Sequence, residues 1–168
     1  MWARAYALQA AGHALSCGRE ADMLGSVHEY PVLIREQHLD TLGHVNNARY
    51  LDLFEEARWD LITRHGYGLD EISRRRVGPV ILEVTLKFQR ELRNRQTIVI
   101  KSWIDSYVGK ISRMTQQMVD EQGRSCCEAQ FVFGLFDLAA RKLISPTPEW
   151  LGAVGLTAAD LLRASPKG

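Results

Sequence analysis

The sequence lacks any uninterrupted apolar stretch of the roughly 18–20 residues that a membrane-spanning helix needs. It also lacks a charge excess, because 21 basic and 20 acidic residues leave a net charge of +1 at pH 7. No long-range electrostatic field therefore selects nucleic acid or an anionic membrane as a partner. We expect a protein with neither a membrane span nor a nucleic-acid partner.

Cysteine is scarce as well: the chain holds only Cys17, Cys126 and Cys127. An odd count closes no disulfide framework, and no spacing among them suits zinc. The chain also has no G-x-S-x-G elbow, no phosphate-binding P-loop and no G-x-G-x-x-G turn. These absences argue against a metal site, a serine hydrolase and a nucleotide-binding fold, and they favour a reduced, cytoplasmic protein.

The chain is long enough for one domain, and its two ends differ from its middle. Residues 1–25 are Ala-rich with scattered Arg and lack the continuous apolar core of a signal peptide, so we expect a loosely ordered extension. Residues 26–150 carry the periodic patterns of one folded domain. Residues 151–168 form a C-terminal segment in which a short helix can start after Thr157.

Within the central domain the pattern changes period twice. Residues 26–38 alternate like a strand in which Pro31 indicates an edge position or a bulge, and residues 39–47 form a polar loop. Helical spacing follows from about Ala48 to His65, then a short charged helix or turn over 68–76. Period-two alternation predicts four further strands over 77–92, 97–109, 110–120 and 124–138. Short connections make them antiparallel, so the pattern predicts an α+β domain of about five strands and one long helix.

The long helix has an unusually wide apolar face. Its apolar positions cover about half of the circumference: Tyr50, Leu51, Leu53, Phe54, Ala57 and Leu61. Such a helix is expected to be wrapped by strands rather than to rest on them. Glu55 and Arg58 stand at i and i+3, and we interpret them as an ion pair on the helix surface.

The loop before this helix holds the main chemical candidates. Asp40 lies just ahead of a helix N-terminus, whose first backbone N–H groups lack intrahelical partners and carry partial positive charge. A carboxylate that activates water or attacks a carbonyl, together with an N–H that binds the developing oxyanion, suffices to cleave an ester or thioester. The same residue types also build Asx-turns and helix caps with no catalytic role, and either Asn46 or Asn47 could be the cap. His44 has no second His or Cys at metal-ligand spacing.

The motif that these residues form adds a resemblance. Asp40-Thr-Leu-Gly-His-Val-Asn-Asn-Ala-Arg-Tyr50, followed by Glu55-Glu-Ala-Arg58, resembles the hotdog-fold acyl-CoA thioesterases. More narrowly it is similar to the 4-hydroxybenzoyl-CoA thioesterase-like group, which includes bacterial long-chain acyl-CoA thioesterases. The resemblance covers about residues 27–138. It implies a hotdog fold, in which an antiparallel sheet wraps one central helix, and hydrolysis of an acyl-CoA thioester in fatty acid metabolism.

The resemblance also implies roles for single residues. Asp40 matches the catalytic carboxylate, as general base or nucleophile, and Asn47 falls where a backbone N–H polarises the thioester carbonyl. His44, Asn46 and Tyr50 match motif positions that line the substrate pocket or hold the loop. No metal or cofactor is implied. Acyl-CoA is the implied partner, together with a second copy of the chain in a homodimer, or a dimer of dimers, with the active sites between subunits.

Three alternatives stay open at this stage. One is a hotdog protein that binds an acyl group or a partner without catalysis. Another is an acyl-ACP thioesterase, although Leu42 stands where the plant enzymes of that kind have Asn in a D-x-N-x-H motif. The third is a hydratase or dehydratase of the same fold, which would use a His–acid pair.

Overall fold

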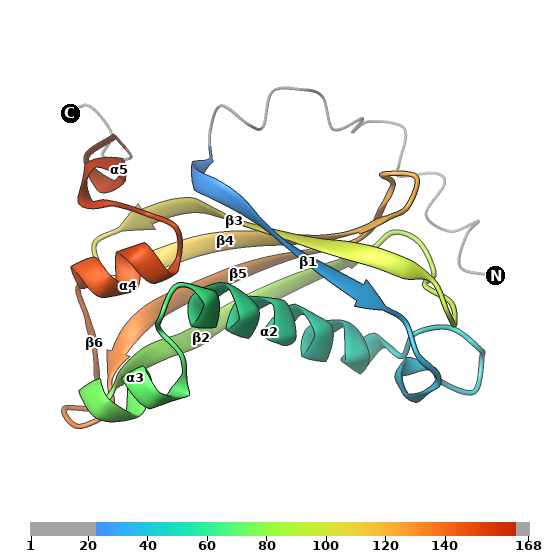
Figure 1. The fold of residues 1–168 in the computed structure, drawn as a ribbon, viewed down its shortest axis with the longest axis horizontal. Helices are drawn as coiled ribbons and strands as arrows, with labels where there is room; N and C mark the ends of the chain where they lie inside the picture. Colours follow the sequence, from blue (N-terminus) through green and yellow to red (C-terminus); the bar gives the residue numbers. More distant parts are fainter. Residues whose placement is uncertain (1–22, 164–168) are drawn as a thin grey trace.

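A computed structural model describes residues 23–163 as one curved antiparallel sheet wrapped around a long helix, α2 (Figure 1). The strands are β1 (Leu24–Leu33), β2 (Val77–Phe88), β3 (Thr97–Val108), β4 (Ile111–Asp120), β5 (Ser125–Asp137) and β6 (Lys142–Ile144). The helices are η2 (Glu36–His38), α2 (Asn47–Arg64), α3 (Leu69–Arg75), α4 (Pro148–Ala153) and α5 (Ala158–Arg163). The sheet order is β1-β3-β4-β5-β2, with β6 paired to β5. The predicted fold is confirmed, with β6 as a short additional strand.

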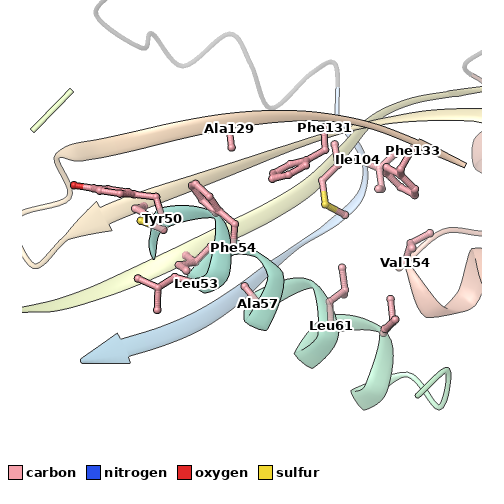
Figure 2. Packing of buried hydrophobic residues seen from close by; sticks show 14 of the residues in the cluster. Tyr50, Leu53, Phe54, Ala57, Leu61, Ile104, Ala129, Phe131, Phe133 and Val154 are labelled. Atoms are coloured by element: carbon pink, nitrogen blue, oxygen red, sulfur yellow. The ribbon is translucent and has the colours of Figure 1, made fainter. Parts of the chain in front are cut away.

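Helix α2 lies in the concave side of the sheet because its apolar face meets the inward side chains of the strands. Phe54 and Ala57 are fully buried, and the Phe54 ring meets Phe131 of β5 edge-on at a centroid distance of 6.1 Å (Figure 2). Every second residue of β3 from Ile98 to Ile104 is buried, as period-two alternation requires. Each fully buried side chain of this size contributes roughly 1.5–3 kcal/mol, so the helix–sheet contact dominates the stability of the domain.

Two sequence-based predictions need correction. The first strand was expected to continue through residue 38, but β1 ends at Leu33 and a turn of 3-10 helix occupies Glu36–His38. The backbone turns there because the His38 N–H donates to the Arg35 carbonyl, and the Arg35 N–H donates to the His38 ring. Glu55 and Arg58 do not form the expected surface ion pair; the Arg58 guanidinium instead turns inward to Gln116 of β4.

The two edges of the sheet differ. β1 pairs only with β3 and carries Pro31, which lacks an N–H, so its edge position agrees with the sequence. β2 is the opposite edge and is twelve residues long. Its apolar side chains are substantially exposed: Ile81 40%, Leu82 47%, Val84 38% and Phe88 38%. A long edge of this kind is a template for pairing with another strand.

The C-terminal part of the described chain packs at one end of the sheet (Figure 1). Trp150 of α4 is buried, and its ring meets Tyr67 and Phe133 edge-on. Helix α5 begins directly after Thr157, as expected, and α4 spans the expected boundary between residues 150 and 151. β1 begins at Leu24, two residues before the expected start of the domain. The extension expected over residues 1–25 lies largely outside the described residues. In residues 23–163 no helix has both the length and the apolar character of a membrane span.

Candidate active site

A tight loop holds Asp40 in front of helix α2. The Asp40 N–H donates to the His44 carbonyl at 3.0 Å, and the Gly43 N–H donates to the Asp40 carbonyl at 3.1 Å. Gly43 has a backbone φ of +81°, a conformation that residues other than glycine adopt only under strain. The space around its Cα is open. The loop between Asp40 and His44 is therefore a closed turn of defined shape.

The two oxygens of the Asp40 carboxylate have different surroundings. Oδ1 accepts a hydrogen bond from the Leu42 N–H at 2.8 Å, which is the Asx-turn that the sequence allowed. Oδ2 lies 3.8 Å from Nδ1 of His44, beyond hydrogen-bond distance, and both side chains are about one quarter exposed (23% and 24%). One oxygen thus accepts a backbone hydrogen bond, while the other accepts none from the described residues and belongs to a side chain that is partly exposed.

At the start of α2 the Asn47 amide has no acceptor among the described residues. Asn46 is the cap: its Oδ1 accepts from the Ala48 N–H at 2.9 Å, and its carbonyl accepts from the Arg49 N–H at 2.9 Å. The Asn47 N–H has no hydrogen-bond acceptor in the described part of the chain. Because this amide lies at the positive end of an 18-residue helix, it is suited to bind an oxygen that gains negative charge.

The connection between β2 and β3 holds the loop in place. The Val45 N–H donates to the Leu92 carbonyl at 2.9 Å, His44 forms an isolated bridge with Arg93, and Leu92 is fully buried. The Asn46 N–H donates to the His38 carbonyl at 2.9 Å. Residues far apart in sequence therefore fix Asp40 and the start of α2 relative to one another, and sequence patterns alone do not reveal these contacts.

Of the five predicted site residues, Asp40 and His44 lie in the loop, Asn46 and Asn47 lie at the start of α2, and Tyr50 is buried inside the protein. Asp40, His44, Asn46 and Asn47 come together, whereas Tyr50 is 4% exposed and packs edge-on against Phe88 at 5.0 Å. Burial raises the pKa of the Tyr50 hydroxyl, so it is protonated at neutral pH. Tyr50 therefore packs under the first turn of α2, on its buried side. Its contact with substrate stays a prediction.

Arg58 is a charged residue that the sequence analysis assigned to the helix surface, although its side chain points inward. It stands at i+4 from Phe54 and i−4 from Ile62, both buried, so helical spacing alone could have placed it among the buried positions. In the structure it lines a pocket near the second half of α2. Among residues 23–163 no group of three or more His, Cys, Asp or Glu side chains is placed to hold a metal ion.

Three comparisons place this geometry among known proteins. The family model described as the Thioesterase-like superfamily matches residues 34–155. The long-chain acyl-CoA thioesterase FadM of Escherichia coli K12 is 27% identical over 115 residues, which cover 68% of this chain and 86% of FadM. The chloroplastic acyl-acyl carrier protein thioesterase ATL3 of Arabidopsis thaliana is 32% identical over 81 residues, 48% of this chain and 43% of ATL3.

A solved structure agrees with these relatives. The crystal structure of YbaW, a probable thioesterase from Escherichia coli, superposes with a TM-score of 0.68 at 26% identity. The match covers 76% of this chain and 98% of YbaW. The residues that the family model matches include Asp40, α2 and strands β2 to β6, but not β1. The chain belongs to the thioesterase-like superfamily and is, as the sequence predicted, a hotdog-fold thioester hydrolase.

Proposed function

We propose that the chain hydrolyses an acyl-CoA thioester to a free acid and CoA, with Asp40 as the reactive carboxylate. One observation carries this proposal: a partly exposed carboxylate with one hydrogen-bonded oxygen lies in the loop just before an amide, Asn47 N–H, that has no acceptor in the described part of the chain. Thioester cleavage needs those two elements and no metal. The relatives named above as thioesterases act on carriers of the same chemistry.

Two routes fit the proposed site. In the first, Asp40 takes a proton from a water molecule, whose oxygen bonds to the thioester carbon while the carbonyl oxygen gains charge against the Asn47 N–H. The carbon–sulfur bond then breaks, and the proton passes from Asp40 to the CoA sulfur. In the second, an Asp40 oxygen attacks the carbon and forms a mixed anhydride, which water hydrolyses after CoA leaves. Both routes consume one water and release one acid and one thiol.

We favour CoA over acyl carrier protein as the carrier. The match to FadM covers a larger share of both chains than the match to ATL3 does, and Leu42 is not the Asn of the D-x-N-x-H motif. Arg90 and Arg93 follow β2. The Arg93 guanidinium pairs with Glu91 at 3.4 Å, whereas that of neighbouring Arg95 is paired with Glu36. We assign Arg90 and Arg93 as the charges that contact the CoA phosphates.

A homodimer formed through β2 completes the proposal. The exposed apolar edge of β2 is long enough to pair with the β2 strand of a second copy, which would join the two sheets. Exposed Leu51 and Trp59 of α2 would then lie beside that junction. A tetramer of two such dimers, a cytoplasmic location and a role in fatty acid metabolism remain further parts of the proposal that rest on the family resemblance.

The test is release of free thiol from a panel of acyl-CoA thioesters of increasing chain length, beside the matching acyl-ACP substrates. Turnover of acyl-CoA that weakens as ionic strength rises is the expected result, because phosphate contacts are screened by salt. Saturable acyl-CoA binding without thiol release would instead identify a non-catalytic acyl-binding protein. Turnover of acyl-ACP alone would reassign the carrier. A change of a double bond in an enoyl or hydroxyacyl thioester would indicate the hydratase alternative.

A further inference from the structure

The buried side of α2 contains a cation. Arg58 lies between Phe54 and Ile62 on the helix face that packs on the sheet, and its guanidinium carbon is 4.1 Å from the centroid of the Phe131 ring. Burial lowers the pKa of Arg58 to about 10, which still leaves the side chain charged at neutral pH. A charge in this position needs partners that compensate for its lost hydration, unless the charge is kept because it has a function.

The partners of Arg58 use only part of its hydrogen-bonding capacity. Nη1 donates to Oε1 of Gln116 at 2.7 Å. Gln116 is fixed in that orientation because its own amide nitrogen donates to the Phe54 carbonyl and to Oγ of Ser102, at 3.2 and 2.8 Å. A guanidinium has five N–H donors. Among the ion pairs of residues 23–163 none involves Arg58, and its one hydrogen bond there is the one to Gln116, so its remaining N–H groups have no acceptor in the described part of the chain.

The pocket that the Arg58 side chain lines is largely apolar and also holds one acceptor, a carboxylate. Arg58 and Glu55 are its charged lining residues, and the rest of the lining is largely apolar, including Ile81, Met114, Phe133 and Trp150. The Glu55 carboxylate accepts from Trp59 Nε1 at 3.3 Å and is not within ion-pair distance of Arg58. The pocket therefore offers a cationic donor and an anionic acceptor that do not neutralise each other by direct contact.

We propose that this pocket receives the distal part of the acyl chain and selects acyl groups that carry a hydroxyl remote from the thioester. A hydroxyl both accepts from Arg58 and donates to Glu55. A second carboxylate would be repelled by Glu55, and a plain alkyl chain would form no hydrogen bond with either group. The proposal rests on the proposed hydrolysis of acyl-CoA and specifies the substrate class of that same site.

The position of the pocket sets where the oxygen lies on the chain. Asn47 and Arg58 are eleven positions apart, so they share one face of α2 and are about 16 Å apart along its axis. An acyl chain whose carbonyl contacts the Asn47 N–H and which follows that face brings its far end, not its first carbons, to Arg58. The selected hydroxyl is therefore near the end of a long chain.

The experiment compares kcat/KM for three CoA thioesters of one chain length: hexadecanoyl, the same chain with a terminal hydroxyl, and the same chain with a terminal carboxylate. The wild type is expected to favour the hydroxylated chain over both others. Arg58→Met, which keeps much of the apolar volume of the side chain, should lower the ratio of hydroxylated to plain substrate about tenfold or more. Glu55→Gln should raise the relative rate on the carboxylated chain.

The outcomes separate the two proposals. If no acyl-CoA is hydrolysed, the proposed function fails. If plain hexadecanoyl-CoA is hydrolysed but the wild type shows no preference for the hydroxylated chain, the substrate-class proposal is overturned, and this result does not depend on whether Arg58→Met folds. Equal ratios in the wild type and in Arg58→Met that still turns over the plain substrate would also overturn it, and would leave Arg58 a structural partner of Gln116.

Discussion

Asn46 links the stability of helix α2 to the geometry of the proposed oxyanion site. Its side chain caps the Ala48 N–H, and its own N–H is held by His38. Asn46→Ala should lower the free energy of unfolding by about 1 kcal/mol and also reduce kcat, because the first turn of the helix loses its fixed orientation. Asn46→Asp, which keeps the acceptor, should retain most of the stability. Thermal unfolding and thiol release measured together check this, and an Ala variant with both values unchanged would contradict it.

At the residue scale the sequence identified the reactive candidates but not all of their surroundings. The run from Asp40 to Tyr50 was enough to predict the carboxylate and the helix start, because a motif reports residues that are close in the chain. Helical spacing could have placed Arg58 on the buried face, but not its contact with Gln116, which is 58 positions away in sequence. Contacts such as Val45 with Leu92 were hidden for the same reason.

At the scale of elements, β5 has no room for a side chain at Gly134. A Cβ there would lie 2.8 Å from the carbonyl oxygen of Lys110 and 2.8 Å from Leu143, where β4 and β6 flank the strand. Gly134→Ala should destabilise the protein by about 1–3 kcal/mol, because a backbone carbonyl cannot move aside at low cost. Gly152→Ala in α4 is the matched control: its Cβ meets nothing within 4 Å, so it should be neutral or stabilising. Chemical denaturation of the two variants checks the difference, and equal effects would refute it.

The packing of β1 against α2 should depend on pH through the side chain of His28. Its Nε2 lies 2.9 Å from Oδ2 of Asp60, which also contacts Nε of Arg64 at 2.8 Å. Burial lowers the pKa of His28 despite the nearby carboxylate. As the pH falls, His28 is therefore protonated in the unfolded chain before it is protonated in the folded protein. The contribution of neutral His28 to the free energy of unfolding is complete well above pH 6.5 and is lost as the pH falls below it. His28→Gln should make the loss of unfolding free energy between about pH 7.5 and 5.5 less steep. Parallel wild-type and variant curves would exclude this role.

The order of strands and helices could be predicted from the sequence because apolar residues recur every second position in strands and at helical spacing in helices, and this spacing reflects burial directly. The expected strands over 97–109 and 110–120 coincide closely with β3 (Thr97–Val108) and β4 (Ile111–Asp120), and the expected helix from Ala48 to His65 differs by one residue at each end. β6 was missed because it is only three residues long, and η2 was taken for strand because its turn depends on backbone hydrogen bonds.

At the scale of the whole molecule, the two edges of the sheet should behave differently. Val84→Lys places a charge on the exposed β2 edge and should shift sedimentation at micromolar concentration from dimer to monomer, and turnover should fall with it if the sites lie between subunits. Leu33→Lys on β1 is the matched control, since Leu33 and Val84 are 39% and 38% exposed. A wild-type monomer, or a dimer that persists in Val84→Lys but is lost in Leu33→Lys, would contradict assembly through β2.

The most direct measurement of the central claim is thiol release from a long-chain acyl-CoA by the wild type and by Asp40→Asn. The amide retains an oxygen that can accept from the Leu42 N–H, so the loop and the fold should persist, but it supplies neither a base nor a nucleophile. We expect a loss of kcat of at least about a hundredfold with an unchanged oligomer and melting temperature. Turnover by Asp40→Asn at the wild-type rate would show that another group performs the chemistry.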